Sequence, residues 1–199
     1  MYEFIEGVIA ELTPAYVVTQ TGGIGYLIHI SLNTYSQLSE RQKQTPQNLQ
    51  KIYLHHVVRE DAQLLFGFFS LQERVIFRLL VTVSGVGANT ARMILSSLGT
   101  SEIQKAIAEG NVTLLKGVKG IGLKTAQRII IDLKDKIGME GSANDNFFQL
   151  NNTIKDEALS ALVTLGFSKS AIEKIVDKIV ATKTDMSVEE LIKQTLKNI

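Results

Sequence analysis

Cysteine is absent from this chain of 199 residues. The chain therefore forms no disulfide, binds no iron–sulfur cluster through thiolates and uses no cysteine nucleophile, which fits a reducing compartment. No apolar run reaches the roughly 18–20 residues needed to cross a bilayer. Residues 1–6 are acidic and strand-like, unlike a secretory signal. We expect a cytoplasmic protein that does not interact with a membrane.

Groups that carry catalysis are also scarce. The chain has three histidines, and His55 and His56 are neighbours in a predicted strand. Their side chains would point to opposite faces, so they cannot share one metal ion. The lysine loop of nucleotide hydrolases is missing, and no carboxylate cluster indicates a two-metal nuclease. The sequence predicts no catalytic residues, no metal site and no cofactor.

Positive charge is concentrated in the middle of the chain. Residues 69–140 contain ten Lys and Arg against six Asp and Glu, whereas residues 1–68 and 141–199 are both slightly acidic. A local excess of positive charge is typical of a region that binds nucleic acid.

This basic segment contains one short motif twice, at Ser84–Ala91 and at Val118–Ala126. In each copy a glycine, an apolar residue and a second glycine are followed, after two further residues, by Thr-Ala. Each copy follows one apolar helical run and begins another, so the pattern predicts a helix, a glycine turn and a helix, repeated. The first N–H groups of a helix have no intrahelical partner, and with the helix dipole they attract anions.

Two interpretations of these turns are open. A single copy is explained equally well as a tight connection between packed helices or as a phosphate-binding turn. The duplication, with Lys124 just after the second glycine pair, favours two contacts to a nucleic acid backbone. A dinucleotide-binding loop is disfavoured because no strand precedes either copy and the third glycine is missing. The candidate phosphate-binding residues are Gly85, Val86, Gly87, Lys119, Gly120, Ile121, Gly122, Lys124, Thr125 and Arg128.

Residues 1–68 have the alternation and turn residues of five short strands, with a small helix between the third and fourth. This order predicts a closed barrel of the OB type. Gly7 indicates a bulge or a bend in the first strand. Asn33 is expected to cap the helix, which should end near Leu38 before a polar loop over residues 39–48.

Adjacent acidic residues, Glu60 and Asp61, lie in the turn between the last two predicted strands, directly after Arg59. Such a pair at a hairpin tip is most often a solvated turn. The functional alternative is a negative projection that repels a phosphate backbone.

The remaining sequence predicts helices. Residues 69–137 form the helical domain with the two glycine turns, residues 138–152 read as a flexible linker, and residues 153–199 predict a three-helix bundle. A bundle of this size has a marginal core and lacks a polar cluster, which suits binding a partner protein better than catalysis. The predicted fold class is therefore α+β and multi-domain, in the order barrel, helical domain, bundle.

Three stretches, Val57–Phe68, Lys119–Ala126 and Ala161–Phe167, make the chain resemble the RuvA family. These proteins are the Holliday-junction-binding subunits of the bacterial branch-migration machine, and the resemblance covers essentially the whole chain. It implies a flat homotetramer, with one or two tetramers on a four-way DNA junction. It also implies that both glycine turns of each subunit contact minor-groove phosphates of one arm.

The resemblance further implies a role for the acidic pair and for the last domain. Glu60 and Asp61 match the family's acidic pin at the crossover, and Arg59 would face the junction. Residues 153–199 match the domain that binds the hexameric ATPase RuvB, and a RuvC-type resolvase is a further partner. The implied ATPase-binding residues are Leu162, Leu165, Gly166 and Phe167.

The chain departs from the family pattern at three positions. Asn89 and Leu123 stand where family members often have lysine, and Lys119 stands where proline is common. Because two candidate charges are missing, we weight the backbone amides of the glycine turns above the side chains.

Two other functions compete with junction binding. A DNA glycosylase also carries such a glycine turn, and Lys124 would then be its nucleophile. That enzyme needs an aspartate beyond the following helix, for which Asp145 is the nearest acid, and a pocket for a flipped base. The second alternative is a duplex-DNA adaptor without any preference for junctions.

Overall fold

The computed structural model describes residues 2–45, 48–144, 154–182 and 186–198. The chain forms two compact units, residues 1–141 and residues 142–199, which are described separately. Among the described residues, every helix is too short or too polar to span a membrane.

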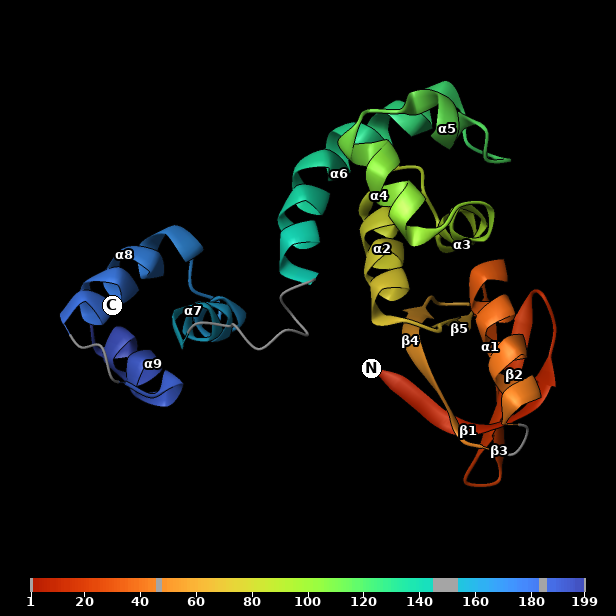
Figure 1. The fold of residues 1–199 in the computed structure, drawn as a ribbon, viewed down its shortest axis with the longest axis horizontal. Helices are drawn as coiled ribbons and strands as arrows, with labels where there is room; N and C mark the ends of the chain where they lie inside the picture. The colour runs from red at the N-terminus through yellow and green to blue at the C-terminus, as the bar shows by residue number, and fades with distance from the viewer. Residues whose placement is uncertain (1, 46–47, 145–153, 183–185, 199) are drawn as a thin grey trace. The chain divides into compact units, whose positions relative to one another are not determined.

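The first unit begins with a closed five-stranded barrel in the order β1-β2-β3-β5-β4 (Figure 1). Neighbouring strands are antiparallel except β3 and β5, which run parallel. The predicted OB-type barrel is confirmed. Its strands are β1 (Phe4–Leu12), β2 (Tyr16–Thr21), β3 (Ile24–Ile30), β4 (Gln50–Val58) and β5 (Gln63–Phe68).

The bulge predicted at Gly7 is wrong. Gly7 pairs regularly with Gln50, and the register of β1 shifts instead between Ile9 and Glu11. A Cβ atom on Gly7 would lie 2.3 Å from the carbonyl oxygen of Gln20 on β2. Glycine is needed here because the two backbones approach closely.

Helix α1 (Leu32–Gln44) differs from the prediction at both ends. Ser31, and not Asn33, is the N-cap, and its side-chain oxygen accepts from the backbone N–H of Thr34. The helix also continues through residues 39–44, where a loop was predicted. Thr34 and Leu38 are buried against the barrel, so packing stabilises a helix that its polar sequence signals only weakly.

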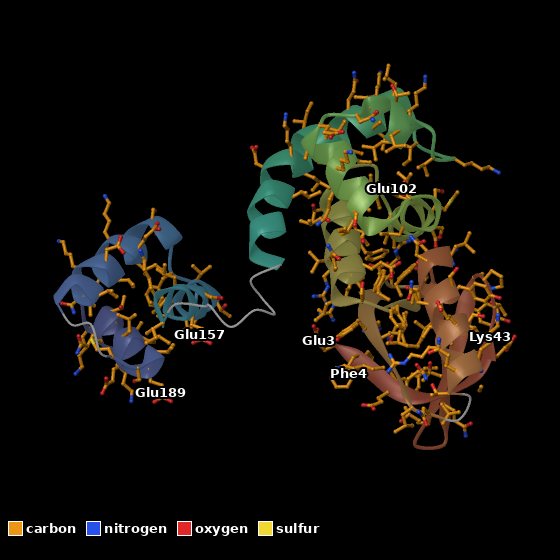
Figure 2. The ribbon with its side chains drawn as sticks, viewed as in Figure 1. Glu3, Phe4, Lys43, Glu102, Glu157 and Glu189 are labelled. Atoms are coloured by element: carbon orange, nitrogen blue, oxygen red, sulfur yellow. The ribbon has the colours of Figure 1, made fainter. Side chains whose placement is uncertain are left out.

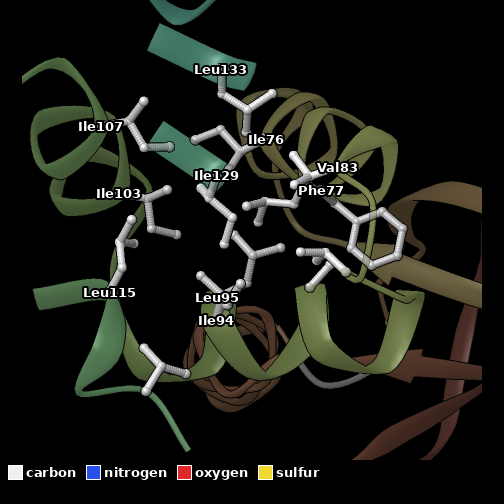
Figure 3. Packing of buried hydrophobic residues seen from close by; sticks show 14 of the residues in the cluster. Ile76, Phe77, Val83, Ile94, Leu95, Ile103, Ile107, Leu115, Ile129 and Leu133 are labelled. Carbon is white, nitrogen blue, oxygen red and sulfur yellow. The ribbon is translucent and has the colours of Figure 1, made fainter. Parts of the chain in front are cut away.

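Five helices complete the first unit and pack with β5 on an apolar core distinct from the one inside the barrel. The rings of Phe66 and Phe68 on β5 lie 5.3 and 4.8 Å from the ring of Phe77. From Phe77 the apolar cluster extends through Ile94 to Ile129 (Figure 3). The helices are α2 (Leu71–Thr82), α3 (Ala88–Ser97), α4 (Thr100–Ala108), α5 (Val112–Lys116) and α6 (Leu123–Asn144).

Helix α6 runs past Gly138, where the linker was predicted to begin, so residues 138–144 are helical. The rest of that linker, residues 145–152, lies outside the described residues. The described part of the second unit contains α7 (Ile154–Thr164), α8 (Lys169–Thr182) and α9 (Val188–Lys197), which pack on an apolar core of their own.

Candidate nucleic-acid interface

The two copies of the glycine motif fold into the same turn. In the first glycine turn (Val83–Gly87), the N–H of Val86 donates to the carbonyl of Val83 at 3.0 Å. In the second glycine turn (Val118–Gly122), the N–H of Ile121 donates to the carbonyl of Val118, also at 3.0 Å. The side chains of Val86 and Ile121 are only 4% and 5% exposed, because they pack into the core.

This geometry changes which amides can contact a ligand. Val86 and Ile121 were predicted to bind phosphate, but each uses its N–H to close its own turn. The first N–H groups of α3 and α6 are different, because the first intrahelical bonds come from Ala91 to Gly87 and from Ala126 to Gly122. The amides of residues 88–90 and 123–125 precede those bonds and have no intrahelical partner. Gly87 has no side chain to cap them.

The four glycines of the turns have two different roles. Gly85 and Gly120 have φ of 90° and 89°, a region that favours glycine, so the turn itself requires them. Gly87 has an ordinary φ of −82°, and φ of Gly122 is not positive either. A Cβ atom on Gly87 or Gly122 would meet nothing within 4 Å. Positive φ and steric crowding therefore do not require glycine here, although glycine suits the start of a helix, and both positions leave room for an external group.

The polar candidates lie around the second turn. Lys119 and Lys124 are exposed, and Thr125 is half-buried. Arg128 is exposed on α6 and donates to the carbonyl of Ser84 in the first turn at 3.3 Å. This bond joins α6, the helix that follows the second turn, to the first turn, and the sequence motif gave no signal for it because its partners are 44 residues apart.

The turn between β4 and β5 is closed by the N–H of Arg59, which donates to the carbonyl of Ala62 at 2.8 Å. Arg59, Glu60 and Asp61 are all exposed. Within the described part of the chain, neither carboxylate forms an ion pair. The acidic turn (Arg59–Ala62) therefore presents two uncompensated negative charges to solvent.

The predicted ATPase-binding residues separate into core and surface. Leu162 is fully buried in the core of the second unit, so it supports the surface without being part of it. Leu165 is 63% exposed, and Phe167 is half-buried. Gly166, with φ of 99°, ends α7 between them. The helical spacing of the apolar residues in α7 already placed Leu162 on the buried face.

No metal or catalytic cluster is found among the described residues. No group of three His, Asp or Glu side chains gathers there. His55 packs against the ring of Phe77 at 5.2 Å, and burial lowers its pKa below the ordinary value. Lys124 has no described acidic partner, and Asp145, which the glycosylase alternative needs, lies outside the described residues.

Known families match the chain along most of its length. The model described as RuvA N terminal domain matches residues 1–67, and RuvA, C-terminal domain matches residues 153–199. The chain belongs to the RuvA family. Between the two RuvA matches, a model for a SAM-like helix-hairpin-helix tandem covers residues 77–135, which include both glycine turns.

Full-length relatives support the same assignment to the RuvA family. Three proteins named Holliday junction branch migration complex subunit RuvA cover 99% or more of this chain and of their own length. They are 46% identical in Azobacteroides pseudotrichonymphae genomovar. CFP2, 48% in Parabacteroides distasonis and 45% in Flavobacterium psychrophilum. The resemblance predicted from the sequence is confirmed, and the glycosylase alternative has no such support.

The two roles of the glycines predict different stabilities. Gly85→Ala and Gly120→Ala should each lower the free energy of unfolding by about 1–3 kcal/mol, because a side chain is strained at positive φ. Gly87→Ala and Gly122→Ala should change it by less than about 1 kcal/mol, because the loss of chain entropy in the unfolded state offsets a weaker cap. Urea denaturation measures all four. Equal losses in both pairs would contradict the assignment.

Proposed function

We propose that this chain is the non-catalytic, DNA-binding subunit of a branch-migration complex in recombination and DNA repair. It binds four-way DNA junctions and recruits a hexameric RuvB-type ATPase. The names of its full-length relatives support this function. From the structure, the observation that carries the proposal is the open space at Gly87 and Gly122.

Each glycine turn contacts one phosphate group through backbone amides. The absence of a side chain at Gly87 and Gly122 lets a phosphate oxygen reach the amides at the start of α3 and α6. Lys119 and Lys124 add positive charge beside the second turn. Contacts of this kind hold the DNA backbone without reading its sequence. The shared core around Val86 and Ile121 holds the two sites in one unit, and the bond from Arg128 on α6 to Ser84 adds to this.

Junction preference comes from the acidic turn in combination with the glycine turns. In a homotetramer, four copies of Glu60 and Asp61 surround the crossover and repel its phosphates, while the glycine turns hold the arms. Arg59 faces the junction next to them. Either one tetramer, or two tetramers on opposite faces of the junction, carry out this function. A RuvC-type resolvase binds the same junction.

The second unit recruits the ATPase. Leu165 exposes a large apolar side chain just after α7, and the half-buried Phe167, two residues later, packs against the core that contains Leu162. An exposed apolar residue on a small bundle is a common anchor for a protein partner.

The competing function is duplex binding without junction preference. We expect this chain to bind a synthetic four-way junction much more tightly than linear duplex of the same sequence, with affinity that falls steeply as salt rises. Gly87→Ala combined with Gly122→Ala should weaken binding to both DNAs by about tenfold or more, because the added methyl groups keep phosphates from the amides. Gel-shift competition measures both effects.

The matched control is Gly99→Ala, which adds a methyl group at the N-cap of α4, where φ is −68°. It should leave both affinities unchanged. Equal wild-type affinity for junction and duplex would support the adaptor instead.

The acidic turn makes a separate prediction. Glu60→Lys with Asp61→Lys should leave junction affinity unchanged or raise it, because two repulsive charges are replaced by attractive ones. The control of ATP-driven branch migration should be impaired. Glu6→Lys with Glu40→Lys makes the same change in net charge at exposed positions of the barrel unit and should leave migration normal. An unfolded acidic-turn variant would show that the turn is structural.

Recruitment of the ATPase should depend on the second unit alone. Removal of residues 145–199, which retains all of α6, should spare junction binding and abolish ATPase recruitment in a pull-down. Leu165→Glu should do the same in the full chain, because it places a charge at the apolar contact. Ile154→Glu, at another exposed apolar position of α7, should still recruit. Recruitment by the truncated chain would contradict the assignment.

A further inference from the structure

The first turn of α1 binds both helices that flank the first glycine turn. Every residue from Ser31 to Thr34 hydrogen-bonds to α2 or α3. Ser31 and Thr34 donate to Glu73 on α2. The side chain of Asn33 donates to the carbonyls of Leu95 and Leu98 at the end of α3, at 2.5 and 3.1 Å. The backbone N–H of Leu32 donates to the hydroxyl of Ser96 at 3.1 Å. We call residues 31–34 together with Glu73 the barrel–hairpin joint.

Glu73 lies at the centre of this joint and is only 3% exposed. One of its oxygens accepts from the Ser31 hydroxyl and the other from the Thr34 hydroxyl, the latter at 2.6 Å. Both hydroxyls also accept a backbone N–H, Ser31 from Thr34 and Thr34 from Phe69. Each hydroxyl therefore donates its one hydrogen bond to the carboxylate. The arrangement needs an acceptor at both positions, which an ionised carboxylate supplies.

Two opposing effects act on this carboxylate. Burial is the larger effect and raises the pKa of Glu73 above its ordinary value, and the hydrogen bonds from Ser31 and Thr34 oppose this only in part. The side chain also lies at the start of both α1, capped by Ser31, and α2, capped by Ser70, where helix dipoles favour negative charge. A buried carboxylate has a high cost unless its bonds are complete, so it tolerates little change in the relative position of α1 and α2.

Arg74, the next residue, fixes the other side of α2. It is buried, forms an ion pair with the Glu3 carboxylate, and donates to the Glu3 carbonyl at 2.7 Å. Glu3 lies just before β1 (Figure 2). Arg74 also donates to the carbonyl of Leu54 on β4 at 3.4 Å. Strand β4 leads into the acidic turn. The first turn of α2 is therefore bonded to α1 through Glu73, and through Arg74 to Glu3 before β1 and to β4, the strand that leads into the acidic turn.

The length of α3 amplifies any movement at the joint. Its C-terminal end is bonded to Asn33, and its N-terminal end carries the first glycine turn. Ten helical residues span about 15 Å, so a rotation of about 10° at the joint would move the far amides by roughly 2.6 Å. A displacement of that size is large compared with the range of a hydrogen bond, so the first glycine turn and the acidic turn could no longer meet one junction in register.

We propose that Glu73 is a positioning residue that sets the orientation of the first glycine turn relative to the acidic turn. Through this orientation it determines the preference for a four-way junction over linear duplex. This inference rests on the proposed function. A single duplex needs only the glycine turns, so a loosened joint leaves duplex binding largely intact. A junction needs the glycine turns and the acidic turn in register at once, so it loses more.

The test compares wild type with Glu73→Gln, which keeps the size of the side chain but offers an acceptor at one position only. The ratio of duplex Kd to junction Kd should fall on the order of tenfold, with duplex Kd nearly unchanged. A variant that only loses stability has a smaller fraction of folded protein, which raises the apparent Kd for duplex and for junction by the same factor. Val17→Ala, a core change in β2 outside the joint, is the control for lost stability and should preserve the ratio. Thr34→Val removes one hydroxyl donor and serves if Glu73→Gln does not fold.

A second measurement needs no DNA. Because the chain has no cysteine, Glu60→Cys and Asn89→Cys allow spin labels at the acidic turn and at the start of α3, with labelled chains diluted in unlabelled ones. Pulsed electron resonance should give a narrow distance distribution in the wild-type background and a broader or shifted one with Glu73→Gln. An unchanged distribution, or an unchanged affinity ratio in a folded variant, overturns the inference. If the wild-type chain shows no junction preference but Glu73→Gln still broadens the distance distribution, the proposed function is refuted and the positioning role is retained.

Discussion

A backbone amide can hold a phosphate only when the phosphate reaches the main chain, and both glycine turns satisfy this requirement. Burial of Val86 and Ile121 fixes each turn in the core, so the following helix begins at a defined place. Gly85 and Gly120 allow the reversal of the chain, and Gly87 and Gly122 leave the surface free of side chains. In the function we propose, contacts through the main chain do not need a lysine at either of the positions occupied by Asn89 and Leu123.

Two such turns hold any duplex, so selectivity must come from how they are arranged. In the first unit, the shared core around Phe77 and the buried bonds of Glu73 and Arg74 join the barrel to the helices. The bond from Arg128 on α6 to Ser84 joins the helix that follows one glycine turn to the other turn. The glycine turns and the acidic turn are thereby held in one fixed pattern, whereas each would bind or repel DNA only weakly by itself. Fixed placement is what allows a shape to be recognised when no base is read.

The sequence predicted the features that local pattern determines. Alternating residues and turn glycines indicated the barrel, and the repeated Gly-apolar-Gly indicated both turns. It did not show which amides close a turn, because Val86 and its neighbours look alike until the hydrogen bonds are known. The sequence predicts Asn33 as the N-cap of α1 because asparagine is favoured at that position. Its bonds to Leu95 and Leu98 span more than 60 residues and leave no local signal. Gly138 was read as a helix stop, yet α6 continues through it.

Closure of the barrel has a consequence for how copies of this chain can meet. Each of the five strands pairs with two neighbours, although β3 meets β5 only over Ile28–Ile30 and β1 meets β4 only over Phe4–Gly7. Addition of a neighbour's strand, the route that open sheets offer, is therefore limited to short stretches of strand edge. Association through the barrel has to use mainly side chains, and exposed apolar residues such as Leu27 and Val58 are available there. The geometry of any ring of subunits is then set by side-chain packing, which single substitutions can alter without disturbing the fold of each copy.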